Sequence, residues 1–453
     1  METMNQIVRL LVVGNRSHRG DAAADLRALT IAAASQRQLL GSWRVAVFVM
    51  AFWLPALTFG SGFDWPQWRG PDRTDVSREN GLLKEWPSGG PKQLWLFKNA
   101  GNGYSGPAIA NGKLFTMGTR DGAEILIALN ADTGEELWTA SIGPIVNFDH
   151  GGGPRGTPAV DGDRIYALGG QGQLICAAVA DGKVIWRGSL SDLGGKTPNW
   201  GYSESVLVDG DKVICTPGGS KGAIAALDKT TGKVIWQSKE FTDPAHYSSV
   251  IVGEHNGMRQ YIQLTAQHVA GVSATDGKLL WKSPFPGRVA VVPTPILHNG
   301  CVYVTAGYGV GCKLVKLGAG NQVSDMYDNK EMKNHHGGVV LVGDHLYGYS
   351  DGPGWMCQEF MSGKEAWSEK NALGKGALSS ADGMLYCLDE NNGTVVLAEA
   401  SPKGWKEHGR FKLNSQSKIR DSKGMFWTHP VISNGKLYLR DQDLIFCYDV
   451  KKG

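Results

Sequence analysis

The residue types that can do chemistry lie in short polar segments, each followed by an apolar run. Guanidinium and ammonium groups bind anions, imidazoles transfer protons or bind metals, carboxylates hold Ca²⁺, and aromatic rings stack on flat ligands. If the apolar runs are strands that begin at one mouth of a ring, these side chains surround one concave site. The candidate binding residues are Arg155, Trp200, Tyr202, Glu204, His246, Tyr247, His335, His336, Lys375, Trp427 and His429.

The same positions also have a purely structural interpretation, because polar residues at strand starts bind water and loops are polar in any case. His335, His336 and His345 lack the spacing of a metal motif, so we assign no metal ligand. The chain has no haem-binding Cys-x-x-Cys-His, no phosphate-binding Gly-x-x-x-x-Gly-Lys and no His-Glu-x-x-His. We therefore assign no catalytic residue.

The elements that position these residues come from a repeat in which a Gly is followed four residues later by a Trp. The pairs are Gly134 and Trp138, Gly182 and Trp186, Gly232 and Trp236, Gly277 and Trp281, and Gly363 and Trp367. The Trp residues are 48, 50, 45 and 86 positions apart, and the last step equals two repeats with one degenerate copy. A period in the forties with strand-like units is typical of a β-propeller.

Each repeat reads as four short antiparallel strands. An alternating apolar run before Asp228 leads into a polar turn that holds Gly232, and a second apolar run ends at Trp236. Asp hydrogen-bonds nearby backbone and Gly accepts positive φ, so the polar part predicts a tight turn. Asp-Gly and Asn-Gly pairs such as Asp209-Gly210 predict the hairpin before it. The Trp then lies on the outermost strand, between neighbouring sheets.

Counting the repeats predicts an all-β fold, an eight-bladed propeller of four-stranded antiparallel blades. Two outer positions are irregular, one near Val323 and one at Trp405, and the last inner strands, 430–449, lack an outer strand. The early strand 93–97 has no inner strands before it, so we expect it to complete the last blade and close the ring. Seven blades with an irregular tail is the alternative.

The first 62 residues read as a leader and residues 63–453 as a single propeller domain. Arg44 precedes an uncharged stretch, 45–59, and then small residues, which is the pattern of a signal peptide. This stretch is short for a membrane span, which needs about 20 residues, although an uncleaved anchor stays an alternative. Residues 1–40 either extend the leader or are included only because the start of the sequence is assigned too far upstream. We expect an exported protein of the periplasm or cell envelope, with membrane contact only through such an anchor.

Composition excludes one class of partner. The chain has 46 Lys and Arg against 43 Asp and Glu, a net charge of +3 that is too balanced for a nucleic-acid partner. Its 7 cysteines form no disulfide framework and lie mostly in apolar runs, so we expect buried free thiols, with a Cys301–Cys312 bridge left open. We expect a monomer.

The motif around Asp228, Thr231, Gly232 and Trp236 resembles the pyrroloquinoline-quinone-type propeller repeat. That repeat is shared by quinoprotein alcohol dehydrogenases and by the propeller lipoprotein of the outer-membrane assembly machine. The opening segment 64–71 is similar to exported planctomycete-type propellers, which are often labelled by similarity to polyvinyl-alcohol dehydrogenase. The resemblance covers residues 64–450 and implies the propeller fold.

The resemblance implies two functions. One is a binding or scaffold module that takes a small-molecule ligand or an envelope protein at the propeller face. The other is a dehydrogenase for an alcohol or sugar that uses pyrroloquinoline quinone with Ca²⁺. In that function Glu204 helps hold the Ca²⁺–quinone pair, Arg155 or Lys375 contacts quinone carboxylates, and Trp200 or Trp427 stacks on the quinone plane.

The chain departs from both groups of relatives. It has no adjacent Cys-Cys pair, which quinoprotein dehydrogenases often carry, and no lipid-attachment Cys near residues 60–62. A third function, binding or cleaving glycans, lacks a well-placed carboxylate pair. Because a propeller fold does not determine an activity, we prefer the binding module.

Overall fold

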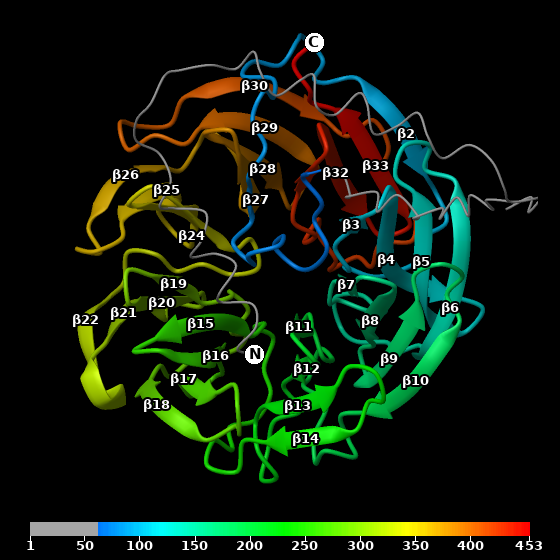
Figure 1. The fold of residues 1–453 in the computed structure, drawn as a ribbon. Coiled ribbons are helices and arrows are strands. Elements are labelled where there is room, and N and C mark those ends of the chain that lie inside the picture. Colours follow the sequence, from blue (N-terminus) through cyan, green and yellow to red (C-terminus); the bar gives the residue numbers. More distant parts are fainter. Residues whose placement is uncertain (1–61) are drawn as a thin grey trace, which may run out of the picture. The chain divides into compact units, whose positions relative to one another are not determined.

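The computed structural model describes residues 62–453, which form eight sheets around a central axis (Figure 1). The leader, including the signal-peptide stretch 45–59, lies outside the described residues. In each blade the strands are antiparallel neighbours, and the outermost strands form the rim in Figure 1. The predicted all-β fold with eight four-stranded blades is confirmed.

Blades 1 to 4 follow one another along the chain. They consist of β3 (Ala108–Ala110), β4 (Lys113–Arg120), β5 (Ala123–Asn130) and β6 (Glu136–Pro144); β7 (Ala159–Asp161), β8 (Arg164–Leu168), β9 (Gln173–Ala178) and β10 (Val184–Ser189); β11 (Leu207–Asp209), β12 (Lys212–Cys215), β13 (Ala225–Asp228) and β14 (Val234–Gln237); and β15 (Ile251–His255), β16 (Met258–Leu264), β17 (His268–Ser273) and β18 (Leu279–Pro284).

Blades 5 to 8 continue the ring. They consist of β19 (Ile296–His298), β20 (Cys301–Ala306), β21 (Gly311–Leu317) and β22 (Val323–Asn329); β23 (Val339–Val342), β24 (His345–Ser350), β25 (Gly354–Glu359) and β26 (Glu365–Glu369); β27 (Gly376–Ala381), β28 (Met384–Asp389), β29 (Thr394–Glu399) and β30 (Glu407–Lys412); and β31 (Val431–Ser433), β32 (Lys436–Asp441), β33 (Leu444–Asp449) and β2 (Gln93–Phe97). One 3-10 turn, η1 (Ala319–Asn321), is the helical element of residues 62–453. In that range no helix has the length and apolar character needed to cross a membrane.

The two ends of the propeller meet in blade 8, as predicted. Strand β2 pairs antiparallel with β33, with Trp95 opposite Cys447. Arg440 on β32 is buried and donates to the carbonyl oxygens of Ser105, at 2.8 Å, and Met117, at 2.6 Å, in blade 1. The ring is therefore closed by a shared sheet and by hydrogen bonds between the last blade and the first.

The Gly–Trp repeat is a contact between neighbouring blades. A β-carbon built on Gly277 would lie 2.4 Å from the Trp236 ring of the preceding blade, and one on Gly182 would lie 2.5 Å from Trp138. Only a residue without a side chain fits against these rings, and the turn also requires positive φ, +72° at Gly277. The outer Trp is thus held by the turn of the next blade along the chain.

Two outer positions differ from the prediction. The degenerate position in blade 5 is filled by Tyr327 on β22, which packs on Gly363 as a Trp would. Trp405 lies before β30 instead of in it, and its ring centroid is 6.2 Å from that of Trp367. The aromatic contact between blades is kept in both places by residues that break the repeat.

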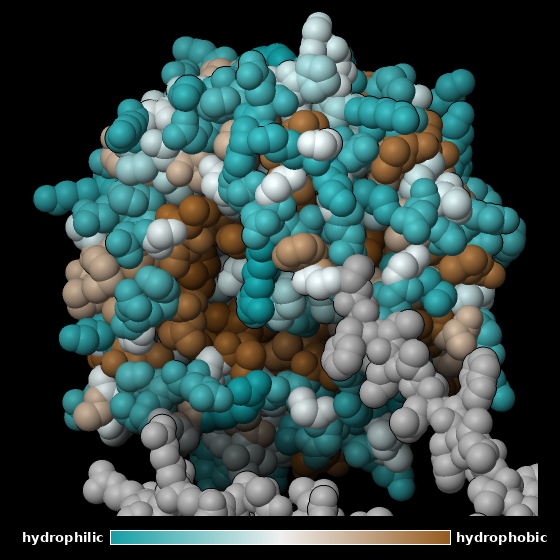
Figure 2. All heavy atoms as spheres, turned by 45° about the horizontal axis from the view of Figure 1, so that its top comes forward, coloured by the Kyte–Doolittle hydropathy of each residue, from teal (hydrophilic) through white to brown (hydrophobic). Residues whose placement is uncertain are grey.

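The core consists of eight hydrophobic clusters, each between two neighbouring blades. All seven cysteines are free and buried, as predicted, so the Cys301–Cys312 bridge does not form. At the hairpin tip Asn111-Gly112 both residues have positive φ, whereas at Asp209-Gly210 only the Gly does. Figure 2 shows a mostly hydrophilic surface around a hollow with hydrophobic residues.

Residues 64–77, here called the channel plug, occupy the space between the innermost strands. Trp65 pairs with Ile109 of β3 in blade 1. Arg73 is buried and donates to the carbonyl oxygens of Ser205, at 2.5 Å, and Val206, at 3.1 Å, before blade 3. On the other side, β1 (Val76–Ser77) runs parallel to β27 of blade 7.

A buried ion pair fixes the end of the channel plug. Arg69 Nε lies 2.7 Å from Asp75 Oδ2, and Arg69 also donates to the Val339 carbonyl of blade 6 at 2.5 Å. His429 Nδ1 lies 2.9 Å from the same Asp75 oxygen, and its Nε2 donates to the His336 carbonyl at 2.8 Å. The plug is therefore built into the channel by hydrogen bonds to blades on all sides of the axis.

Candidate functional site

A cavity of about 640 Å³ lies on the propeller axis, and Trp68 of the channel plug is part of its wall. Every blade contributes the segment just before its innermost strand. In blade order these residues are Tyr104; His150 and Arg155; Trp200, Ser203 and Ser205; Tyr247 and Ser249; Val289, Ala290 and Val292; His335 and His336; Lys375; and Lys423, Met425, Trp427 and His429.

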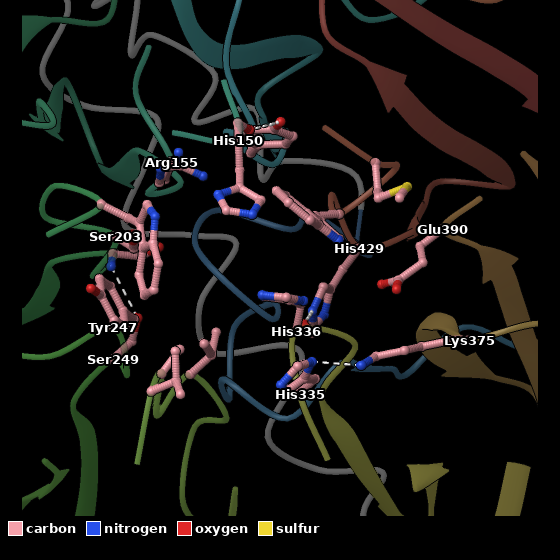
Figure 3. Close-up of a pocket in the computed structure, with 18 of the residues that line it drawn as sticks. His150, Arg155, Ser203, Tyr247, Ser249, His335, His336, Lys375, Glu390 and His429 are labelled. Carbon is pink, nitrogen blue, oxygen red and sulfur yellow. Dashed lines mark hydrogen bonds between the residues drawn. The ribbon is translucent and has the colours of Figure 1, made fainter. Parts of the chain in front are cut away.

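The structure brings eight of the eleven predicted residues together in this cavity. They are Arg155, Trp200, Tyr247, His335, His336, Lys375, Trp427 and His429. Figure 3 shows Arg155 and Lys375 on opposite sides of the cavity, with His335 and His336 in the lower middle of the view. The segments converge because the innermost strands of all blades begin at the same end of the ring.

The other three predicted residues, Tyr202, Glu204 and His246, do not line the cavity. Successive side chains of an extended segment point to opposite sides. Before β11, Ser203 and Ser205 face the cavity, so Tyr202 and Glu204 face the core between blades. The same alternation before β15 places Tyr247 at the cavity wall and His246 away from it.

Each of these three side chains has partners inside the protein. Glu204 accepts hydrogen bonds from the Thr216 N–H at 2.6 Å and the Thr216 hydroxyl at 2.7 Å, and burial raises its pKa to about 7. The Tyr202 hydroxyl donates to the Pro217 carbonyl at 3.1 Å. His246 Nδ1 accepts the Val291 N–H at 2.9 Å, and burial lowers the pKa of this imidazole. The bonds of Glu204 and Tyr202 therefore lie within blade 3, and the His246 bond joins blades 4 and 5.

Thirteen of the 21 wall residues were not among the predicted ones, and Tyr308, Glu390, His150 and Trp68 are four of these thirteen. Tyr308 and Glu390 lie in the turns between the second and third strands of blades 5 and 7, which open at the same end of the blade as the start of its first strand. The antiparallel order of strands is the signal that could have found them. His150 lies in a long loop before β7, and Trp68 lies in the channel plug, so neither follows from the repeat.

Aromatic rings form a continuous belt around much of the cavity wall. In order around the wall the rings are Tyr247, Trp200, His150, Trp427, His336, His335 and Tyr308, with neighbouring centroids between 4.0 and 6.3 Å apart. Such a wall offers flat apolar faces together with ring N–H and hydroxyl groups at their edges. It suits a ligand that contains one or more rings.

Arg155 is the cation at one side of the cavity. Its guanidinium lies over the Tyr104 ring, 4.9 Å from the centroid, and donates through Nη2 to the Gly151 carbonyl at 2.8 Å. Its Nε is buried without a hydrogen-bond partner, and no carboxylate of residues 62–453 pairs with this guanidinium. Burial lowers the pKa of Arg155.

Lys375 and His335 form a hydrogen-bonded pair on the opposite side. Lys375 Nζ lies 2.9 Å from Asp351 Oδ1 and 2.5 Å from His335 Nδ1. Burial, and next the charge of Lys375, lower the pKa of His335 to about 4, so the ring is neutral near pH 7. Because Nδ1 accepts from the ammonium, the ring proton is on Nε2, which is buried without a partner among the described residues.

Two more imidazoles complete this set of nitrogens. Burial, and next the neighbouring His335, lower the pKa of His336 well below its usual range. His336 Nδ1 and His150 Nδ1 are buried and have no hydrogen-bond partner within residues 62–453. Buried polar groups are nearly always hydrogen-bonded in folded proteins, so a cluster of such nitrogens in one cavity indicates a ligand or water that supplies hydrogen-bond partners.

The cavity does not suit a Ca²⁺–quinone pair. Ca²⁺ takes six to eight oxygen ligands, usually with several carboxylates. Glu390 is the carboxylate that lines the cavity, burial raises its pKa, and Glu204 is occupied by Thr216. Residues 62–453 contain no group of three or more His, Cys, Asp or Glu side chains placed to hold a metal ion, so His345 joins no metal site with His335 and His336.

Comparisons with known proteins agree with the fold. A family model described as outer membrane protein assembly factor BamB matches residues 121–396. Tetrathionate hydrolase of Acidithiobacillus ferrooxidans is 26% identical over 56% of this chain and 51% of its own, and BamB of Kangiella koreensis is 26% identical over 45% and 48%. The chain thus spans about half the length of these curated relatives. The solved quinohemoprotein alcohol dehydrogenase of Comamonas testosteroni has the same fold, with a TM-score of 0.59 at 11% identity over 86% of this chain and 81% of its own.

Proposed function

The chain belongs to the family described as outer membrane protein assembly factor BamB, and on this premise we propose that it is a binding module of the cell envelope that holds a small molecule in its central cavity. One observation carries the proposal: unpartnered buried nitrogens from separate blades, Arg155 Nε and His335 Nε2 among them, converge on one cavity. A scaffold alone gains nothing from such groups, because each costs about 1–3 kcal/mol when it stays unsatisfied.

The place in the cell follows from the leader and from the relatives. The signal-peptide pattern over 45–59 and the name of the matching family both support the periplasm or cell envelope. The same name supports an envelope protein as a partner at the propeller face. We propose that residues 63–453 act as one propeller domain and as a monomer, with membrane contact only where the leader is kept.

The names of the relatives also bear on the ligand. Tetrathionate, named in the Acidithiobacillus ferrooxidans relative, is an inorganic oxyanion. An oxyanion supplies acceptor oxygens for the donors Arg155 Nε and His335 Nε2, which have no partner among the described residues. A quinone-dependent dehydrogenase is the second candidate, favoured by the aromatic belt and by Arg155 and Lys375 on opposite sides. It is the weaker one, because the cavity lacks the oxygen ligands for Ca²⁺.

Native mass spectrometry of the purified protein tests the binding module. We expect a co-purified small molecule, and we expect it to be lost in Val289→Trp, because Val289 is half-exposed at the cavity and an indole there narrows the entrance. Ile419→Trp is the matched control, since Ile419 is similarly exposed but does not line the cavity. Equal occupancy in both variants would place the molecule elsewhere.

A thermal-shift titration separates the two candidates. Pyrroloquinoline quinone and Ca²⁺ are added separately and together, and a ligand of the folded state raises the melting temperature by mass action. We expect no rise that needs both. A saturable rise that requires the pair would support the dehydrogenase instead.

A further inference from the structure

We propose that the ligand of the cavity is a ring-bearing organic anion whose acidic group binds Arg155 directly, without a metal ion. This inference rests on the proposed function, in that the cavity is taken as the ligand site, and it adds the chemical class of the ligand.

Arg155 is half-buried at the cavity and has fewer hydrogen-bond partners than the buried arginines Arg69, Arg73 and Arg440. Arg69 has Asp75 as its ion-pair partner, and Arg440 donates to several oxygens, among them the Ser105 and Met117 carbonyls. Arg155 donates a hydrogen bond to the Gly151 carbonyl and lies over the face of the Tyr104 ring, and its Nε has no hydrogen-bond partner in the described part of the chain. A guanidinium presents a rigid fork of donors that matches the two oxygens of a carboxylate or sulfonate, so an acidic group is what this side chain lacks.

The rest of the wall favours an anion as well. Ser205 Oγ accepts the Thr157 N–H at 2.8 Å and Ser249 Oγ accepts the Ser205 N–H at 3.0 Å, which leaves both hydroxyl hydrogens free to donate. His335 adds its unpartnered Nε2–H. Glu390 is the one carboxylate of the described wall, and Lys375 lies close enough to offset its charge. The free donors named here outnumber this one carboxylate, which favours a ligand rich in acceptor oxygens.

The body of the ligand is set by the aromatic belt. Trp200 and Trp427 lie on either side of His150, with ring centroids 6.0 and 6.3 Å from it. The apolar side chains Val289, Ala290 and Val292 line the blade 5 wall. A ligand whose ring system packs against these groups and whose acidic group binds Arg155 contacts both the aromatic belt and the guanidinium. At about 640 Å³ the cavity has the size of sites that enclose drug-sized molecules.

A matched pair of fluorescent probes tests the class. 8-Anilinonaphthalene-1-sulfonate carries rings and one anionic group, and N-phenyl-1-naphthylamine has the same rings without the sulfonate. We expect the purified protein to bind the sulfonate at one site and at least about tenfold more tightly than the neutral probe, with no change on addition of EDTA. Removing one partner of a buried charge pair weakens binding by a factor of about 30 or more, so Arg155→Gln should do this to the sulfonate alone.

Three further variants keep the result interpretable. Arg187→Gln removes an exposed arginine on β10 and should change neither probe. Arg155→Lys keeps the charge and should retain part of the affinity if Arg155→Gln folds poorly. Val289→Trp should weaken both probes if they bind in the cavity.

The outcomes distinguish this inference from the proposed function. Equal binding of the two probes, both blocked by Val289→Trp and both indifferent to Arg155→Gln, would overturn the anionic class and leave the cavity as a ligand site. Loss of sulfonate binding on EDTA treatment would overturn the metal-free arrangement. Binding that Val289→Trp does not affect, or no binding of either probe, would count against both proposals.

Discussion

Gly277 packs against Trp236 of the preceding blade so closely that a β-carbon on the glycine would lie 2.4 Å from Cε3 of the indole. The sequence repeat of Gly and Trp is therefore not a property of one blade. Each Gly and Trp of the repeat takes part in the packing of one blade against its neighbour.

Gly277→Ala should destabilise the propeller far more than Gly257→Ala. Both glycines have nearly the same φ, +72° and +73°, but a β-carbon on Gly257 would have no other atom within 4 Å. We expect a loss of about 1 kcal/mol from backbone strain at Gly257 and about 1–3 kcal/mol more at Gly277 from overpacking. Urea midpoints of the two variants measure the difference, and equal midpoints would show that the indole moves aside freely.

Asp75→Asn should destabilise the channel plug strongly. The change leaves the buried Arg69 guanidinium and His429 without the charge they share, and breaking a buried ion pair costs about 3–5 kcal/mol. Asp72→Asn is the matched control, because the Asp72–Arg78 pair is exposed and is worth at most about 1 kcal/mol. Chemical denaturation reports both values. A similar small loss in the two variants would mean that the plug contributes little to stability.

Glu204→Ala should lower stability without changing the affinity for the anionic probe. The variant leaves the buried Thr216 N–H without its acceptor, which costs about 1–3 kcal/mol, whereas the cavity wall is unchanged. Glu390→Gln makes the opposite comparison, because it removes a negative charge from the wall and should tighten sulfonate binding. Probe titrations and melting curves of both variants separate the two roles. Weaker probe binding in a folded Glu204→Ala variant would return Glu204 to the site.

Glu124→Gln should stabilise the protein at pH 8 and have little effect at pH 5. Burial raises the pKa of Glu124 to about 7 from its ordinary value of 4.5, so between these two values the folded state binds more protons than the unfolded state. Stability therefore falls as pH rises through this window, and Gln removes the loss, about 1–3 kcal/mol at pH 8. The Gly170 N–H keeps its acceptor in the variant. Melting temperatures at the two pH values measure the effect, and an equal shift at both would exclude ionisation as its cause.

The fold could be predicted from the sequence because the contact between blades requires both a large ring and a glycine, and these leave a visible repeat. Blade 5 was harder to recognise, since Tyr327 serves there in place of Trp. The site was predicted in part. The segments were the right ones, but the face that each one turns to the cavity was not known, so Tyr202 and Glu204 were chosen and Ser203 and Ser205 were not.

The channel plug shows why the rest could not be predicted. Trp68 donates its indole N–H to Thr294 at 3.0 Å, across 226 positions of sequence. No periodicity connects such residues, because the plug lies outside the repeat. Its place becomes clear only when the ring is closed around it.

The pairing of Trp95 with Cys447 also sets an order of events during synthesis. Strands β1 and β2 leave the ribosome first, yet their partners β27 and β33 are among the last strands to appear. Until then the early strands have unpaired edges, which are prone to pair with other chains. Non-local pairing of this kind is slow, so ring closure should be the late step of folding, and a chain that stops short of β33 should be unable to complete it.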